Sequence, residues 1–387
     1  MKLIKNLHLA LLACLLLQLI PPSEIAAQPK AHARGNAQAA ASVARDIEIA
    51  SQFAPVFYQG LGDKRRYDYI TNIDFDGDWR GDNNWDNADD TRFPLRAYVY
   101  YAVSETHTHF FVHYAVFHPR DYKGDTAGGR MLSEIIREGV RRGGRYDPTG
   151  LSGEAVLAHE NDMEGCLVVA AKNGAEVKAA RVVFVETMAH DRFLKYVPAV
   201  EGVGDKNAFA RVRIESGRPE LYVEAKGHGI LAFDGGEKQR PSNGSLVYKF
   251  KGRADDPEKS PADEIGYALV AISTTLWPRA RGGVNQTFGA AHQFGARIFG
   301  AAHAQSRTTA AQRRSVKLGN LGVAFRGSKG APNAARPPWG WFDRGDRGRL
   351  RGEWFFDPAV TIKRHFKLSD DFSVVYTHAP LLGVNRK

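Results

Sequence analysis

The chain has 387 residues, of which 43% are hydrophobic and 11% aromatic. This is enough to build one large core or two ordinary ones, and it excludes a largely disordered protein. The formal charge is +10, and a basic protein is drawn to anionic lipids and polysaccharides by long-range fields that salt weakens. Nucleic acid is not expected as a partner, because the arginines are scattered and no helix-turn-helix or zinc-finger spacing is present.

The first residues have the order of a secretory signal peptide. Two lysines precede an apolar run over residues 7–20, which two prolines and small residues follow. Because about 20 apolar residues are needed to span a membrane, we interpret residues 1–27 as a cleaved signal and predict a secreted or periplasmic protein. The alternative is lipidation at Cys14, although the apolar run continues past that residue.

The cysteine count limits how the mature protein is stabilised. Without the signal segment, Cys166 is the one remaining cysteine, so a disulfide within the chain is excluded. We expect Cys166 to be a small buried hydrophobe, and we expect the protein to be a monomer.

Residues 28–50 are predicted as an N-terminal tail that runs into a short helix at about 37–51. From Phe53 onward, short runs of branched and aromatic residues alternate with Gly, Asn and Asp, which predicts strands and turns. The predicted strands are residues 55–59, 95–105, 107–118, 165–172, 179–189, 218–227, 244–250, 265–272 and 372–382. The prediction is an all-β fold, a mainly antiparallel β-sandwich with a helical insertion and long loops, forming one domain over residues 51–387.

Two insertions and one hairpin organise this domain. Residues 95–105 and the strand after them are separated only by 106–108, a length suited to a hairpin. Residues 122–157 contain apolar positions at near-helical spacing and are predicted as the helical insertion. The second insertion, 283–338, is rich in Gly and Ala and is predicted as a surface loop. The alternative for that segment is an element that docks on lipid through spaced residues such as Phe288 and Phe294.

A crowded polar stretch, HENDMEG at residues 159–165, stands directly before the apolar run CLVVAA. We predict a loop leading into a strand, where a period of two places Asp162 and Glu164 on one side. One imidazole, His159, and two carboxylates suit a divalent cation, with Ca or Mg expected ahead of Mn or Zn. The zinc-protease spacing H-E-x-x-H is absent, because Met163 stands four residues after His159.

An acid at an upstream strand end completes this pattern. Residues 114–121, YAVFHPRD, end a predicted strand with Asp121. Together with HENDMEG, this segment resembles the necrosis- and ethylene-inducing toxin family, whose members carry a strand end of the type Y-x-x-x-F-P-K-D and then the heptad G-H-R-H-D-W-E. The resemblance implies a β-sandwich whose cation helps to engage a sugar head group of a membrane lipid. It also implies a divalent-cation pocket lined by four residues: Asp121, His159, Asp162 and Glu164.

The chain is also similar to vacuolar-sorting-related relatives of that fold, which open with a phrase like residues 53–57, FAPVF, and keep an Asp-x-Glu pair. It departs from the toxin heptad at Ala158, Asn161 and Met163, and about thirty inserted residues separate the two motifs. Glu160 and Asn161 are expected to be bystanders. The departures leave the pocket chemistry intact and put plant toxicity in question.

The loop at residues 74–86, DFDGDWRGDNNWD, alternates acids as a calcium loop does. An EF-hand is excluded, because Trp79 stands where that loop needs glycine and Trp85 where it needs glutamate. Two interpretations remain: a turn held by Asx hydrogen bonds, or a loop whose tryptophans stack on a sugar while its acids accept hydroxyls. The candidate ligand-binding residues are Asp74, Asp76, Asp78, Trp79, Trp85 and His228.

These observations favour an exported, divalent-cation-dependent binding protein that engages a glycan or an anionic lipid surface, with cytolysis as one outcome. The alternative is a metal-assisted hydrolase or lyase acting on an envelope or extracellular polysaccharide. A third hypothesis is an interaction module without a metal. Serine hydrolysis is not supported, because residues 150–154, GLSGE, miss the G-x-S-x-G motif at their last position.

Overall fold

In a computed structural model of the protein, the described residues are 27–122, 159–189, 192–199, 209–240, 242–294, 317–328, 335–343, 345 and 351–386. The predicted signal peptide and helical insertion lie almost entirely outside them. The chain divides into two units, Met1–Asp46 and Ile47–Lys387. Helix α3 (Ala27–Gln52) begins earlier than the predicted helix. Among the described residues, no helix is long and apolar enough to cross a membrane.

The second unit is built from strands and short helices. Its strands are β1 (Val56–Gly60), β2 (Tyr98–Thr106), β3 (His109–Asp121), β4 (His159–Ala171), β5 (Arg181–Ala189), β6 (Arg192–Pro198), β7 (Ala210–Val212), β8 (Ile214–Glu215), β9 (Arg218–Val223), β10 (Ile230–Ala232), β11 (Ser245–Phe250), β12 (Glu264–Ala271), β13 (Phe288–Phe294), β14 (Gly319–Phe325) and β15 (Tyr376–His378). Its α-helices are α4 (Asn84–Asn87), α7 (Leu276–Ala280), α8 (Glu353–Phe356) and α9 (Pro358–His365). Its 3₁₀ helices are η1 (Arg65–Asp68), η2 (Val177–Ala179), η3 (Glu237–Gln239), η4 (Ile272–Thr274), η5 (Pro338–Gly340) and η6 (Pro380–Leu382). Every predicted strand overlaps an observed one, because branched and aromatic side chains suit a pleated surface.

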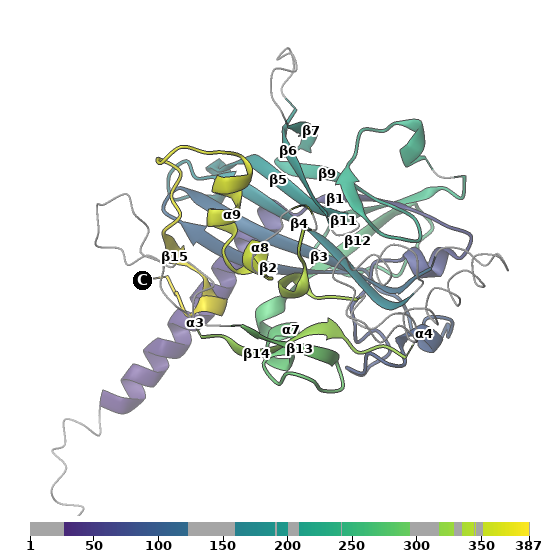
Figure 1. Ribbon diagram of the computed structural model, residues 1–387, viewed down its shortest axis with the longest axis horizontal. Coiled ribbons are helices and arrows are strands. Elements are labelled where there is room, and N and C mark those ends of the chain that lie inside the picture. Colours follow the sequence, from purple (N-terminus) through teal and green to yellow (C-terminus); the bar gives the residue numbers. More distant parts are fainter. Residues whose placement is uncertain are drawn as a thin grey trace, which may run out of the picture. The chain divides into compact units, whose positions relative to one another are not determined.

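Among the described residues, one sheet of 13 strands dominates the second unit (Figure 1). Its order is β10-β9-β1-β11-β12-β2-β3-β4-β5-β6-β7, with β15 added on β2 and β8 on β9. The two ends of the sheet approach each other, since the Thr187 hydroxyl on β5 donates a 2.6 Å hydrogen bond to the Ile230 carbonyl on β10. The sheet is therefore nearly closed on itself.

The predicted all-β class is confirmed in this form, but the structure does not show a sandwich of two facing sheets. Strand β12 pairs in parallel with both β11 and β2, and β1 pairs in parallel with β9. These parallel pairs continue the hydrogen bonding where a sandwich would have a break between its sheets. The result is one curved sheet with an antiparallel majority.

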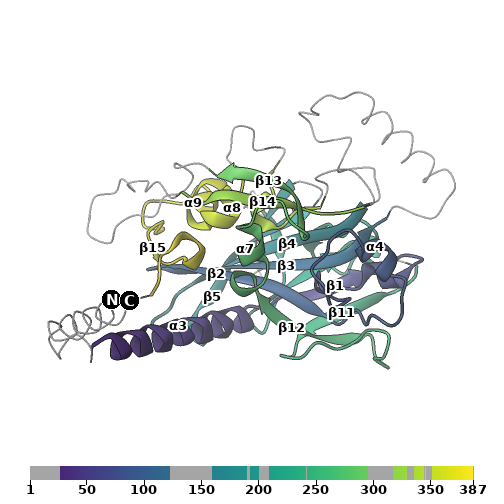
Figure 2. The ribbon, with the colours of Figure 1, turned by 90° about the horizontal axis from the view of Figure 1, so that it is seen from below.

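Strands β2, β3 and β4 form the part of this sheet that carries the predicted cation ligands, and Figure 2 shows β3 and β4 side by side. The predicted hairpin is confirmed, with Glu105 on β2 opposite Phe110 on β3. Strand β4 pairs antiparallel with β3 from His159 to Ala171. The prediction that HENDMEG forms a loop is therefore wrong, because the long partner strand β3 supplies backbone hydrogen bonds to these polar residues as well.

The second predicted insertion contains a second sheet. Strands β13 and β14 pair antiparallel, and Phe288 and Phe294 are 0% and 1% exposed. Phe288 stacks on Phe325, with ring centroids 5.4 Å apart. A side chain at Gly322 would bring its Cβ within 2.5 Å of the Phe288 ring. The prediction of a plain surface loop is wrong for these residues, and buried phenylalanines are not available to dock on lipid.

Trp341 packs against β4. The Trp341 indole nitrogen donates to the Met163 carbonyl at 3.1 Å, and a Cβ at Gly165 would lie 2.5 Å from the same ring. Cys166, the next residue, is 0% exposed, and burial raises the pKa of its thiol. The prediction of a buried, hydrophobic Cys166 is confirmed.

Candidate functional site

Two of the four predicted cation ligands meet where β3 ends and β4 begins. Asp121 and His159 are direct partners in the antiparallel register. The Oδ2 atom of Asp121 lies 3.6 Å from Nε2 of His159, and each residue is 4% exposed. The other ring nitrogen, Nδ1, lies 3.2 Å from the Glu160 carbonyl. This leaves Nε2 as the nitrogen that faces the carboxylate.

Asp162 instead contacts His228, which follows β9. Nδ1 of His228 lies 2.8 Å from Oδ2 of Asp162, and Nε2 lies 3.3 Å from Oδ1 of Asp68. Burial by itself lowers the pKa of His228, but its hydrogen bonds to the two carboxylates and their charges outweigh burial and raise this pKa to about 10. A protonated His228 donates to a carboxylate on each side. The neighbouring His118 stacks on it at 3.7 Å and donates to Oε1 of Gln59 at 3.0 Å. Burial and the charge of His228 hold the pKa of His118 well below its usual range.

Asp68 is a partner that the sequence did not indicate. It is 0% exposed, and its two oxygens accept the backbone N–H groups of Gly62 at 2.7 Å and Lys226 at 2.6 Å. These bonds attach the end of η1 to the turn that carries His228. A single acid within the segment RRYDYI carried no motif, so only the fold reveals this role.

Glu164 completes the predicted set. It lies opposite Val116 on β3, two residues after Asp162, and is 9% exposed. By the period of two, the side chains of Asp162 and Glu164 leave β4 on the same face. Among the described residues, however, no group of three or more His, Cys, Asp or Glu side chains is arranged to hold a metal ion. The four predicted ligands are therefore neighbours on β3 and β4, and only Asp121 and His159 face each other.

The spacing of that pair is compatible with a shared cation. Two ligand atoms that each lie roughly 2.0 to 2.4 Å from one ion are about 3 to 3.6 Å apart at ordinary coordination angles. The observed 3.6 Å between Asp121 and His159 is at the upper end of this range. It also exceeds the distance of a normal N–H···O hydrogen bond. The distance therefore allows Asp121 and His159 to share a cation, whereas Asp162 and Glu164 match a ligand set only by residue type.

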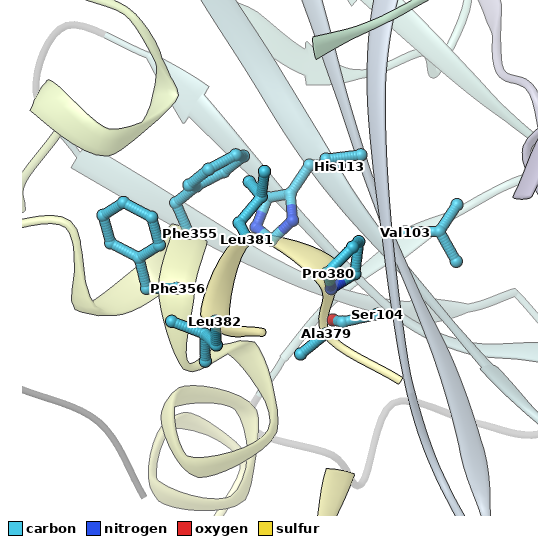
Figure 3. A pocket seen from close by; sticks show the side chains of 10 residues that line it. Val103, Ser104, His113, Phe355, Phe356, Ala379, Pro380, Leu381 and Leu382 are labelled. Atoms are coloured by element: carbon cyan, nitrogen blue, oxygen red, sulfur yellow. The ribbon is translucent and has the colours of Figure 1, made fainter. Parts of the chain in front are cut away.

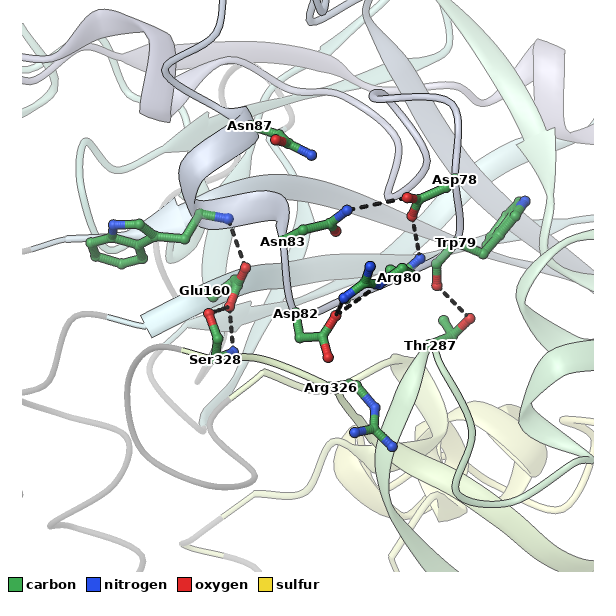
Figure 4. A network of polar contacts seen from close by, with 12 residues as sticks. Asp78, Trp79, Arg80, Asp82, Asn83, Asn87, Glu160, Thr287, Arg326 and Ser328 are labelled. Carbon is green, nitrogen blue, oxygen red and sulfur yellow. Dashed lines mark hydrogen bonds and ion pairs between the residues drawn. The ribbon is translucent and has the colours of Figure 1, made fainter.

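Glu160, predicted as a bystander of the cation site, holds two other segments against the start of β4. Its Oε1 accepts the Trp85 backbone N–H at 2.7 Å, and its Oε2 accepts the Ser328 backbone N–H at 2.6 Å and its hydroxyl at 3.1 Å. Figure 4 shows Glu160 beside Ser328 in this network. Glu160, expected to be no ligand of the cation, thus has a structural role, and its carboxylate joins α4 to the segment after β14.

Asn161 adds three further contacts. Its Nδ2 donates to the carbonyls of Gly81 at 2.6 Å and Arg326 at 2.7 Å, and its Oδ1 accepts from Asn84 at 2.7 Å. It is 0% exposed, and its φ of 59° lies in the left-handed region, which asparagine tolerates better than most residues. Asn161, also expected to be no ligand of the cation, therefore has a structural role as well.

The acidic loop at residues 74–86 satisfies its own carboxylates. Asp74 accepts from Asn72 at 2.7 Å, and Asp76 accepts from the Asn87 side chain at 2.6 Å. Asp78 accepts the Arg80 backbone N–H at 2.6 Å. These contacts match the interpretation as a turn held by Asx hydrogen bonds, and the loop is fixed to β4 through Glu160 and Asn161.

The tryptophans of this loop stack on arginines. The Arg279 guanidinium lies 3.4 Å from the Trp79 ring centroid, and the Arg120 guanidinium lies 4.4 Å from that of Trp85. One face of each ring is thereby covered, which limits stacking on a sugar. His228 is 0% exposed and contacts Asp162, so it belongs with the β4 acids.

A separate small cavity lies between β2, β3, α8 and η6, and Figure 3 shows His113 pointing into it among apolar side chains. Its walls include Phe355, Leu381 and Leu382. Nε2 of His113 lies 3.1 Å from the Trp354 carbonyl, and burial lowers the pKa of this histidine to about 3. A neutral ring that donates to the backbone gives His113 a structural role.

No protein-family model matches the chain, and no curated protein matches it. Solved structures do match. The chain is similar in structure to necrosis- and ethylene-inducing proteins. The non-toxic HaNLP3 protein is 12% identical over 61% of this chain and 80% of its own, with a TM-score of 0.29. Necrosis and Ethylene inducing Protein 2 from the causal agent of cocoa's Witches Broom disease is 16% identical over 58% of this chain and 73% of its own, with a TM-score of 0.26.

A third similar structure is NLPPya in complex with glucosamine, 16% identical over 39% of this chain, with a TM-score of 0.21; the match spans half of NLPPya. The resemblance predicted from residues 114–121 and 159–165 is confirmed by these neighbours. All three TM-scores lie well below 0.5, so these neighbours indicate nothing about the function of this chain.

Proposed function

We propose that the protein is exported and binds a glycan-bearing or anionic lipid surface through a divalent cation, Ca or Mg, held at the start of β4. The observation that supports this most is the Asp121–His159 pair, whose donor atoms lie 3.6 Å apart across two paired strand ends. Asp162 and Glu164 follow on β4 and complete the proposed ligand set with two further carboxylates.

Charge supports the same proposal. Asp121, Asp162 and Glu164 are 4%, 6% and 9% exposed, so three carboxylates are concentrated and nearly buried on adjacent strands. Burying carboxylates costs free energy unless a cation or hydrogen bonds compensate. His228 compensates Asp162 in part. A hard divalent cation beside Asp121 would add to this compensation, and carboxylate oxygens are the ligands that Ca and Mg prefer.

When bound, the cation would offer an acceptor point for hydroxyl, carboxylate or phosphate oxygens of a surface ligand. The chain's own residues would fix the position of that point: β3 and β4 hold Asp121 and His159, and His228 orients Asp162. The formal charge of +10 would draw the protein toward an anionic surface, most strongly at low salt. The signal-like segment at residues 1–27 supports export.

Calorimetry tests the cation step. We expect the purified protein to bind Ca or Mg, and we expect Asp121→Asn and Asp162→Asn each to weaken binding at least about tenfold, the scale seen when a metal site loses a supporting group. Glu176→Gln is the matched control, because this carboxylate is 70% exposed and lies outside β3 and β4. Equal affinity in the wild type and both Asn variants, or no binding at all, would rule out the site.

Vesicle sedimentation tests the surface step. We expect binding to anionic or glycolipid vesicles with Ca or Mg present and loss of that binding in EDTA and in Asp121→Asn. Release of a dye trapped in the vesicles would indicate that the protein also damages membranes. Sedimentation without dye release would indicate a protein that binds the surface and does not lyse it. Equal sedimentation with and without EDTA would contradict cation-dependent engagement.

A further inference from the structure

A polar hollow of about 420 Å³ lies on the second unit. It is bounded by η1 and by the loop before β12, and it shares no residue with the proposed cation site. Its volume falls within the range of roughly 300 to 1,000 Å³ that is usual for small-molecule sites. The residues that line it are Arg65, Tyr69, Leu246, Pro257, Glu258, Ser260, Pro261, Ala262 and Asp263.

The floor of the hollow is largely apolar and includes one tyrosine hydroxyl. Tyr69 is 6% exposed and Leu246 is 2% exposed, and Pro257 is also buried. Among the described residues, the Tyr69 hydroxyl forms no hydrogen bond to the protein, and it is not among the buried polar atoms left without a partner, so solvent reaches it. Burial is the largest of the effects that raise the pKa of Tyr69, with the charge of Glu258 adding to it and that of Arg65 opposing it. The Tyr69 hydroxyl is therefore available to a ligand that enters the hollow.

The rim of the hollow carries a hydrogen-bond donor, Arg65, and an acceptor, Asp263, which do not pair with each other. Arg65 and Asp263 are exposed and line the same hollow. Across the described residues, neither side chain forms an ion pair or hydrogen bond. A guanidinium offers five N–H donors and a carboxylate offers acceptor oxygens only. The rim can therefore bind a ligand that is rich in groups that both donate and accept.

The walls of the hollow are held in place before any ligand arrives. The Arg66 guanidinium bonds Glu258, joining η1 to the loop. The Val247 backbone N–H donates to the Asp263 carbonyl at 2.7 Å, and the Ser260 hydroxyl donates to the Ala262 carbonyl at 3.1 Å. A preformed site loses less entropy on binding than one that must fold around its ligand.

From this combination we propose that the hollow is a carbohydrate subsite that works without the cation, for a sugar ring that is neutral or carries an amino group. A simple anion would meet Asp263 and Glu258, a simple cation would meet Arg65, and an apolar ligand would leave the charged rim unsatisfied. A sugar has an apolar face for Pro257 and Leu246 and hydroxyls for Tyr69, Arg65 and Asp263. An amino group would add an attraction to Asp263.

Sugar titrations followed by NMR in EDTA test this subsite, with glucose, glucosamine and N-acetylglucosamine as probes. We expect saturable binding of at least one sugar in EDTA, weakened about fivefold by Tyr69→Phe, the scale of one lost hydrogen bond. This variant should fold, because the Tyr69 hydroxyl bonds nothing in the described protein. Tyr98→Phe, outside the hollow, is the matched control. We expect Asp263→Asn to weaken glucosamine more than glucose.

Two results separate this subsite from the proposed cation site. Binding in EDTA that survives Asp121→Asn but not Tyr69→Phe would support the hollow, even if no cation binds the protein. The subsite is overturned if no sugar binds in EDTA, or if Tyr69→Phe and Asp263→Asn bind every sugar as the wild type does. Sugar binding that requires Ca or Mg and is lost in Asp121→Asn would also overturn it, and would leave the cation site as the place where sugars are held.

Discussion

His228 shows how one side chain can join three segments of the chain. Its ring bonds Asp162 on β4 and Asp68 at the end of η1, and it stacks on His118 of β3. All of these side chains are buried, so water cannot solvate the positive charge of His228 in place of its carboxylate partners. Removing one partner of a buried charge pair leaves the other charge uncompensated.

We therefore expect His228→Gln to lower the free energy of unfolding by about 3 kcal/mol, the lower end of the cost of breaking a buried ion pair. Urea unfolding measured by tryptophan fluorescence would give this value. His107→Gln is the control, since His107 is exposed in the turn between β2 and β3, and it should change stability by less than about 0.5 kcal/mol. Similar losses in both variants would show that the two carboxylates do not depend on His228.

The surroundings of Glu105 on β2 predict that the stability of the protein decreases at acid pH. Burial by itself raises the pKa of Glu105, but hydrogen bonds and charges from Lys172 and Arg386 outweigh burial and hold the pKa below its usual range. A folded-state pKa below the unfolded value stabilises the protein above the unfolded pKa of about 4.3. This stability is lost as pH falls through the folded pKa.

We expect Glu105→Gln to cost about 2 kcal/mol at pH 7, the scale of hydrogen bonds to a charged group. The difference between variant and wild type should shrink as pH falls below about 4.3. Urea unfolding at several pH values between 7 and 3 would measure both effects. A difference that stays constant over this range would show that the Glu105 charge contributes nothing to folding.

At the scale of elements, the start of β4 holds two distant segments together. Glu160 and Asn161 bond the loop at 81–85 on one side and residues 326–328 on the other. A strand normally alternates its side chains between two faces. The left-handed backbone of Asn161 interrupts this alternation, so two successive polar side chains can both serve the same junction.

Two substitutions at Asn161 separate its side chain from its backbone. Asn161→Gly keeps the left-handed φ at no steric cost but loses three hydrogen bonds, and we expect it to cost about 2 to 3 kcal/mol. Asn161→Ala loses the same bonds and adds a left-handed penalty of about 1 kcal/mol. Urea unfolding of both variants would show this order, and hydrogen exchange should rise at residues 81–87 and 326–328. Equal stability of Gly and Ala would mean that the backbone conformation at 161 is relaxed.

At the scale of the whole second unit, the local sequence pattern was sufficient to predict most strands. It was not sufficient to predict that the sheet curves until its two ends approach each other. Branched and aromatic runs predicted β1, β2, β3 and β5, since those residues favour strands wherever they are paired. The start of β4 has no such run, and it is a strand only because β3 continues beside it to Asp121. Parallel pairs such as β12 with β2 join residues far apart in sequence, and no local pattern encodes that choice.

The candidate site divides in the same way. The types and order of Asp121, His159, Asp162 and Glu164 could be taken from the sequence, and the register of β3 with β4 brings the first two together. The contact of Asp162 with His228 could not be predicted, because β9 and β10 reach β4 only through the curvature of the sheet. The two glycines that flank His228 were the one feature of the local sequence that marked this position. The left-handed φ of 50° at His228 places it in a tight turn, which flanking glycines accommodate easily.

Closure of the sheet can be tested at Thr187, whose hydroxyl bonds the Ile230 carbonyl at 2.6 Å and so ties β5 to β10. Thr187 is 0% exposed, so Thr187→Val leaves a buried carbonyl without its donor and should cost about 2 kcal/mol. Thr187→Ser keeps the hydroxyl and loses a methyl group, for which we expect a cost of about 1 kcal/mol. Hydrogen exchange in β10 should rise in the Val variant and not in the Ser variant. Unchanged exchange in both would mean that packing alone holds the two ends of the sheet together.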